Sequence, residues 1–160
     1  MSKKEVLAYA KTNIGYTEGK NNSNIFAHVA GHPNHQPWCA TFIVACFKVG
    51  QEGKAIKDSA SVIEIAKWAI RNAAVIEASD AEPGDVLLFD FSGHGYPEHV
   101  ELATSNYNRK TKTIRTIGGN TGSGRSGNQS NGDGVYQKAR GYSTIHMAIR
   151  PKWGKNENQS

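Results

Sequence analysis

The chain contains only two cysteines among its 160 residues, Cys39 and Cys46. On one helix, residues seven apart would lie two turns, or about 10 Å, from each other along the axis. A disulfide needs Cα atoms within about 7 Å, so we expect no internal bridge. Two cysteines are also too few for the usual cysteine-rich zinc sites. Both residues are therefore predicted to be free thiols, each either structural or catalytic.

Long apolar runs are absent as well. No stretch approaches the roughly 18 apolar residues that a transmembrane helix requires, so we expect no membrane insertion. The N-terminal segment, MSKKEVLAYAKTNIGY, lacks the continuous apolar core and the small-residue cleavage site of a secretory signal. We therefore expect the protein to be made in a cytoplasm, and to need another agent for delivery elsewhere.

Acidic residues are in the minority. The sequence has 19 Lys and Arg against 14 Asp and Glu, which gives a formal net charge of +5. This excess favours acidic partners such as nucleic acid, anionic lipid or an anionic polymer like cell wall, without choosing among them. Ordinary aromatic and hydrophobic content, 9% and 38%, argues against global disorder.

The first half of the chain has helical periodicity. Residues 4–12 form one predicted helix, with Ser2 as a possible N-cap. A second is predicted to begin at Pro37, a residue favoured in a first helical turn, and to end near Gly50. Its apolar stripe comprises Cys39, Phe42, Ile43, Cys46 and Phe47. A third covers residues 60–72, with four residues facing inward: Val62, Ile65, Ala66 and Ala69. Residues 15–26 and 31–36 are interpreted as loops.

After residue 80 the pattern changes to that of β-strands. Five strands are predicted, within residues 82–91, 99–108, 111–120, 134–142 and 145–151. A Gly/Ser/Asn-rich loop, 118–134, joins the third to the fourth, and loops of this length are often functional. Helices followed by an antiparallel sheet predict an α+β fold. We expect one catalytic-type domain over residues 1–152, and a polar tail or the start of a linker over 153–160.

The position of Cys39 favours reactivity. A helix N-terminus stabilises negative charge and so promotes the thiolate form, and Cys39 is predicted at the second or third position of its helix. Cys46 falls in the middle of the same helix and is interpreted as core. Because Cys39 also lies on the apolar stripe, a small buried structural residue is the alternative interpretation.

A catalytic cysteine needs an imidazole partner, and the sequence has six histidines. His99 opens the strand HVELA directly after a loop, where it can lean toward a helix N-terminus packed on the sheet. The others are interpreted as loop, turn or structural residues: His28, His32 and His35 as surface loop residues rather than a metal site, His94 in a turn, and His146 in a strand.

A third residue should hold the imidazole by its other nitrogen. Asn120 ends the next strand, and in an antiparallel hairpin this end lies beside the start of the preceding strand. A turn asparagine is the alternative interpretation. Glu101 is the competing candidate, because it shares a strand face with His99. Its alternative interpretation is a solvent-facing charge.

Four segments, QPWCATF, EPGDVLLFD, HVELA and TIGGNTG…GDGVYQKAR, together resemble the CHAP domain, a cysteine- and histidine-dependent amidohydrolase/peptidase. The resemblance extends from about residue 4 to 151. It implies a papain-like fold and peptidoglycan hydrolysis, with Cys39 as nucleophile, His99 as general base and Asn120 as the orienting residue. Many relatives carry a glutamate two residues before that asparagine, where this chain has Gly118. The choice between Asn120 and Glu101 therefore stays open.

The resemblance also bears on substrate binding and on metals. Papain-like enzymes use a glutamine side chain as an oxyanion donor, a role that Gln36 would take here beside the backbone N–H of Cys39. Trp38, Tyr96 and Phe91 are candidates for lining the cleft, or else for packing. Some relatives bind calcium through carboxylates ahead of the cysteine. AGHPNHQ has none, so we expect no calcium there, and no metal or cofactor at the site.

The leading hypothesis is a cell-wall lytic enzyme that cleaves a peptidoglycan amide bond. It would be an N-acetylmuramoyl-L-alanine amidase or a peptidoglycan endopeptidase, from a phage endolysin or a bacterial autolysin. The absent signal favours an endolysin released through a holin-type pore. We expect a monomer with bacterial peptidoglycan as partner. The alternative is a non-catalytic basic module that binds wall glycan or nucleic acid, although no nucleic-acid-binding motif is present.

Overall fold

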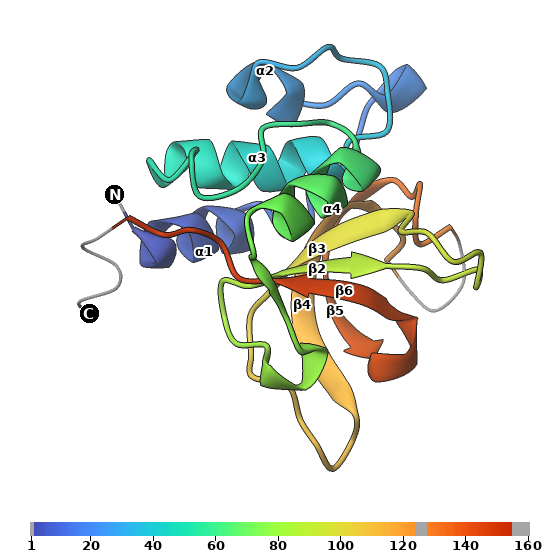
Figure 1. Ribbon diagram of the computed structural model, residues 1–160. Coiled ribbons are helices and arrows are strands. Elements are labelled where there is room, and N and C mark those ends of the chain that lie inside the picture. Colours follow the sequence, from blue (N-terminus) through green and yellow to red (C-terminus); the bar gives the residue numbers. More distant parts are fainter. Residues whose placement is uncertain (1, 124–127, 155–160) are drawn as a thin grey trace.

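The computed structural model describes residues 2–123 and 128–154. Helices lie against one side of a six-stranded antiparallel sheet formed by these residues (Figure 1). The helices are α1 (Lys3–Thr12), α2 (Phe26–Ala30), α3 (Cys39–Val49) and α4 (Val62–Arg71). The strands are β1 (Val75–Ile76), β2 (Val86–Phe89), β3 (His99–Ala103), β4 (Thr113–Thr121), β5 (Gly134–Gly141) and β6 (Ile145–Ile149). The predicted α+β class is confirmed, with N-terminal helices packed on an antiparallel sheet.

Serine caps define the starts of two predicted helices. The hydroxyl of Ser2 accepts a hydrogen bond from the backbone N–H of Glu5 at 3.0 Å, which confirms the N-cap of α1. Ser61 caps α4 in the same way through the N–H of Glu64 at 3.2 Å. The five-residue helix α2 was not predicted, because it is too short for its apolar spacing to stand out from the surrounding loops.

Helix α3 is the central element of the helical layer. It begins at Cys39 with Trp38 as its N-cap, so Pro37 lies outside the helix and not in its first turn as predicted. Every residue from 39 to 47 is buried, which exceeds the single predicted stripe. The reason is that four elements pack against α3, namely α1, α2, β3 and β4. Only the last two residues of α3, Lys48 and Val49, reach the surface.

The sheet order is β1-β6-β2-β3-β4-β5, so β3 lies between β2 and β4. All five predicted strands are confirmed, and the two-residue β1 is an addition. In the β2–β3 ladder Phe89 pairs with His99, and in the β3–β4 ladder Leu102 pairs with Ile117. His99 is therefore the first residue of an interior strand. It lies at the end of the sheet where the β2–β3 loop enters β3.

The two faces of the sheet bury separate apolar clusters. Val100, Leu102 and Ile117 belong to the larger cluster, which includes the helices. Phe89 and Ala103 belong to a smaller cluster on the opposite face. Because side chains alternate along a strand, His99 and Glu101 share the face of Ala103, and both are fully buried. Two polar side chains thus lie inside the protein, where each needs a partner.

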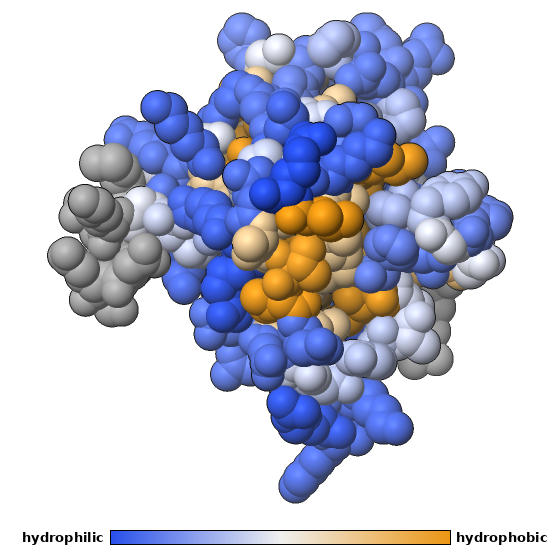
Figure 2. All heavy atoms as spheres, viewed as in Figure 1, coloured by the Kyte–Doolittle hydropathy of each residue, from blue (hydrophilic) through white to orange (hydrophobic). Residues whose placement is uncertain are grey.

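The surface carries one apolar region in the view of Figure 2, over β1 and β6 below α4. Exposed large apolar residues of these elements include Ile70 of α4 and Val75 of β1. This is the sheet edge where β1 is only two residues long, so β6 is incompletely covered. Within the described ranges, no helix is both long and apolar enough to span a bilayer.

Candidate active site

Cys39 is the first residue of α3 and only 6% exposed. The first N–H groups of a helix have no intrahelical acceptor, so they favour an anion at this position. The adjoining strand approaches closely. A Cβ atom on Gly119 would lie 2.7 Å from both the Phe42 Cβ and a ring carbon of Trp38. Glycine at this position therefore lets β4 pack directly on the first turn of α3, beside Cys39.

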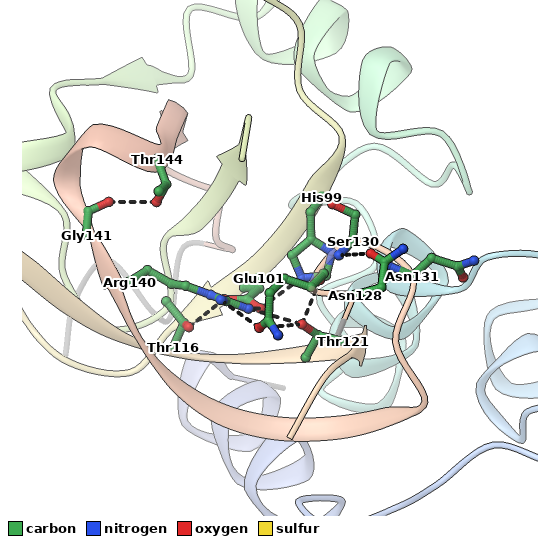
Figure 3. A network of polar contacts seen from close by, with 11 residues as sticks. His99, Glu101, Thr116, Thr121, Asn128, Ser130, Asn131, Arg140, Gly141 and Thr144 are labelled. Carbon is green, nitrogen blue, oxygen red and sulfur yellow. Dashed lines mark hydrogen bonds and ion pairs between the residues drawn. The ribbon is translucent and has the colours of Figure 1, made fainter. Parts of the chain in front are cut away.

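His99 is bound through one ring nitrogen. Its Nε2 lies 2.8 Å from Oε2 of Glu101, and both side chains are fully buried (Figure 3). Its Nδ1 makes no hydrogen bond of standard geometry with any described residue. The thiol of Cys39 is one of the groups that raise the pKa of His99, which places it near the imidazole. One nitrogen is therefore held by a carboxylate while the other is left for the thiol.

The charge state of His99 follows from these neighbours. Burial by itself would lower the pKa of His99, but the thiol of Cys39 and the carboxylate of Glu101 together outweigh burial and raise the pKa to about 9. The imidazole is therefore held as an imidazolium at neutral pH. This is the state that stabilises a neighbouring thiolate and can later donate a proton to a leaving group.

The Glu101 carboxylate is held by donors from three strands. Oε1 accepts from Thr116 Oγ1 at 2.7 Å and from Arg140 Nε at 2.8 Å. Oε2 accepts from Arg140 Nη2 at 2.6 Å in addition to its contact with His99 (Figure 3). Burial alone would raise the pKa of Glu101, but Arg140 and His99 lower it to about 2. The interpretation of Glu101 as a solvent-facing charge is thus wrong.

With His99 as an imidazolium, the charges of Glu101, Arg140 and His99 sum to +1. Glu101 contributes one negative charge, and Arg140 and the His99 imidazolium contribute one positive charge each. An uncompensated buried charge is strongly destabilising, whereas paired charges are tolerated. A thiolate on Cys39 would balance the imidazolium charge, and a neutral thiol beside a neutral imidazole is the other proton arrangement with zero net charge.

Asn120 does not bind His99. Its side chain is fully buried, and neither Nδ2 nor Oδ1 finds a hydrogen-bond partner within the described ranges. The backbone of Asn120 is left-handed, with φ +54°, and lies where the β4–β5 register shifts between Gly118 and Thr121. This irregularity removes Asn120 from the regular ladder that the prediction assumed. The hydrogen bond predicted for Asn120 is made by Glu101, the alternative candidate.

Gly118 explains how Glu101 fits. A Cβ atom at Gly118 would lie 2.4 Å from Oε2 of Glu101 and 2.5 Å from its Cγ, closer than side-chain atoms approach in proteins. The carboxylate therefore occupies the space that a side chain on β4 would need. Glu101 in this position therefore requires a residue without a side chain at 118.

Trp38 packs in the core, which was the alternative to its candidate role in lining the cleft. It is fully buried, its ring stacks with Phe26 at a centroid distance of 5.5 Å, and its indole N–H donates to Glu18 at 3.0 Å. As the residue that caps α3, it lies beneath α2 and the preceding loop and serves packing. Gln36 is half-buried in the turn before α3, and its proposed oxyanion role stays a prediction.

The β2–β3 loop contributes aromatic rings near the imidazole. The Phe91 ring lies 5.7 Å from that of His99, measured between centroids, and Phe89 lies 6.2 Å from it. Tyr96 is 50% exposed and stacks on His94 at 5.2 Å. Phe91 therefore packs against the imidazole, and Tyr96 is the more accessible of the two predicted cleft residues.

One group of metal-ligand type lies in the same loop. Ligand atoms of Asp90, His94 and Glu98 all lie within 4.8 Å of one another. The carboxylates already accept backbone hydrogen bonds, Asp90 from His94 and Gly95 and Glu98 from Phe91 and Ser92. We assign them to holding the loop in shape before β3.

His32 differs from its predicted role as a surface residue. Its ring nitrogens lie 2.8 Å from Thr41 Oγ1 and 2.6 Å from Asp58 Oδ1, and its side chain is only 10% exposed. It ties the loop before α3 to the loop before α4. His28, His35, His94 and His146 are exposed.

Sequence reasoning missed Thr116 and Arg140. Thr116 lies on β4 and Arg140 on β5, so both reach Glu101 across strands that are distant in sequence. The only signal was an arginine in the strand GVYQKAR at a position that proved to be 8% exposed. In comparisons with protein-family models, curated proteins and solved structures, the chain matches none significantly.

Proposed function

We propose that the protein is a cysteine-dependent hydrolase that cleaves an amide bond of bacterial peptidoglycan. The observation that carries this proposal is the arrangement of three side chains. Cys39 at the start of α3 faces His99, whose Nε2 is held by the buried Glu101 at 2.8 Å. A nucleophile, a base and an orienting group in this order are the parts of acyl-transfer catalysis.

In the proposed reaction the Cys39 thiolate attacks the carbonyl carbon of the amide. The negative charge that develops on oxygen is stabilised by free N–H groups at the start of α3, the Cys39 N–H among them. The His99 imidazolium donates its proton to the leaving amine as the C–N bond breaks, which leaves a thioester on Cys39. Neutral His99 then takes a proton from water, whose oxygen attacks the thioester and releases a carboxylate.

Glu101 keeps the imidazole in one orientation through both steps. Because its carboxylate accepts hydrogen bonds from Thr116 and Arg140, it stays ionised and acts as an acceptor for His99, not as an acid. Substrate identity rests on the four CHAP-like segments and on the net charge of +5, which suits an anionic wall. Both candidate bonds, the muramoyl–alanine amide and a peptide bond, use this chemistry.

The test is digestion of purified peptidoglycan, followed by mass spectrometry of the released fragments. The unmodified protein should generate new amine termini, and their identity names the bond. Cys39→Ala should release none, whereas Cys46→Ala, the matched change two turns along α3, should release the same fragments as the unmodified protein. Binding to the polymer without cleavage would instead support a non-catalytic wall-binding module.

A further inference from the structure

Arg140 stands at the centre of the polar network in Figure 3. Its guanidinium donates four hydrogen bonds: two to Glu101, one from Nη1 to Gln129 Oε1 at 3.0 Å, and one from Nη2 to Thr121 Oγ1 at 3.1 Å. The planar fork of arginine suits such two-point binding of a carboxylate, and it fixes direction as well as charge.

The guanidinium also packs on aromatic rings that touch the imidazole. Its central carbon lies 4.9 Å from the Phe91 ring centroid and 5.7 Å from that of Phe89, within cation–π range. Both rings pack against His99. Arg140 therefore restricts the position of the His99 ring indirectly in two ways. It holds the carboxylate that binds Nε2, and it packs on the aromatic rings beside the imidazole.

We propose that Arg140 is a positioning residue of the proposed hydrolase, which fixes the Glu101 carboxylate and thereby the orientation of His99 toward Cys39. Arg140 touches neither the thiol nor the reacting amide, so its contribution passes entirely through Glu101 and Phe91. This inference rests on the proposed function for its meaning in catalysis, but its geometry can be tested without a peptidoglycan substrate.

The structure supplies a matched control in Arg150. It binds the Asp85 carboxylate with the same fork, Nε to Oδ1 at 3.1 Å and Nη2 to Oδ2 at 2.9 Å. Asp85 is nearly fully buried, like Glu101, but no histidine lies in its contacts. Loss of either arginine removes a two-point ion pair with a buried carboxylate. Only the ion pair of Arg140 is next to the proposed catalytic pair.

The effect on pH dependence has a definite sign. The titratable groups that face the His99–Glu101 pair are Cys39 from α3 and Arg140 and Lys138 from β5. Removing the positive charge of Arg140 raises the pKa of each titratable group in this cluster. Protonation of the cluster should therefore begin at higher pH, and reactivity that depends on the ionised form should be lost earlier on acidification.

The experiment measures the rate of Cys39 alkylation by iodoacetamide against pH, and kcat/KM on peptidoglycan, in Arg140→Met, Arg140→Lys and Arg150→Met. Arg140→Met should move the acid limb of alkylation to higher pH and lower kcat by about a hundredfold with little change in KM. Arg140→Lys keeps the positive charge but loses the two-point binding of the carboxylate. The acid limb of its alkylation profile should therefore stay near that of wild type, while kcat falls. Arg150→Met should change neither.

An Arg140→Met protein that matches Arg150→Met in both measurements would overturn the inference. If Arg140→Met does not fold, Arg140→Lys decides, because wild-type kcat in that variant excludes a positioning role for the fork. Alkylation separates this inference from the proposed function. A shifted acid limb in a protein that never cleaves peptidoglycan would retain the positioning role and reject the substrate.

Discussion

Cys39 and Cys46 are both buried, both free and both on α3, yet their surroundings differ. Cys46 lies in the middle of the helix, where burial raises the pKa of its thiol far above the usual range. Cys39 lies at the helix start, facing an imidazolium that is held by an ionised carboxylate. Burial alone makes a cysteine inert. A free helix terminus and a charged partner distinguish the two thiols, and removing either feature should make Cys39 resemble Cys46.

The largest effect should come from removing the imidazole. His99→Ala deletes the proton donor and acceptor, so hydrolysis of peptidoglycan should fall by roughly 10⁴-fold. His146→Ala is the matched control, because His146 is an exposed residue of β6. Initial rates of fragment release measure both variants. A His99→Ala protein that is folded by circular dichroism and as active as His146→Ala would remove His99 from the mechanism.

A smaller loss is expected from the orienting position, where Glu101 and Asn120 can be compared. Glu101→Gln removes the charge that holds the imidazolium, and we expect kcat to fall by about 10³-fold. Asn120→Ala removes a side chain that makes no hydrogen bond to His99 in the described structure, and we expect a loss of about tenfold or less. Steady-state kinetics on one substrate preparation rank the two. The reverse ranking would return the orienting role to Asn120.

The smallest effect concerns stability against pH. Because the pKa of His99 is raised in the folded protein, the imidazolium stabilises the fold fully below pH 6.5, and this contribution is lost as the pH rises through about 9. Cys39 is one cause of that raised pKa, so in a background that already carries Cys46→Ala, the added change Cys39→Ala should reduce the stability lost between pH 6.5 and 9.5. Urea unfolding at the two pH values gives the difference. Equal losses in Cys46→Ala and in the double variant would mean that Cys39 does not interact with His99.

Local patterns were sufficient to predict much of this arrangement. Helical spacing located α1, α3 and α4, Ser2 caps α1 as expected, and β3 covers the segment HVELA. The fold class followed from the order of these elements. The proximity of Cys39 and His99 also followed, since a helix terminus and a strand start were expected to meet.

The features of the site that the sequence did not predict depend on geometry across strands. The burial of Trp38 arises from α2, whose position no local pattern predicted. The choice of Glu101 over Asn120 depends on a left-handed residue at a register shift and on the space left by Gly118. The role of Arg140 depends on its side chain reaching from β5 across β4 to Glu101 on β3, a contact between residues 39 apart in sequence.

The most direct test of the central claim is the rate at which iodoacetamide alkylates each thiol at neutral pH, in wild type and in His99→Ala, followed by peptide mass spectrometry. Cys46 is an internal standard for a buried thiol on the same helix. We predict that Cys39 reacts about a hundredfold faster than Cys46 in wild type, and that His99→Ala removes most of this difference. Equal, slow labelling of both cysteines in wild type would contradict it.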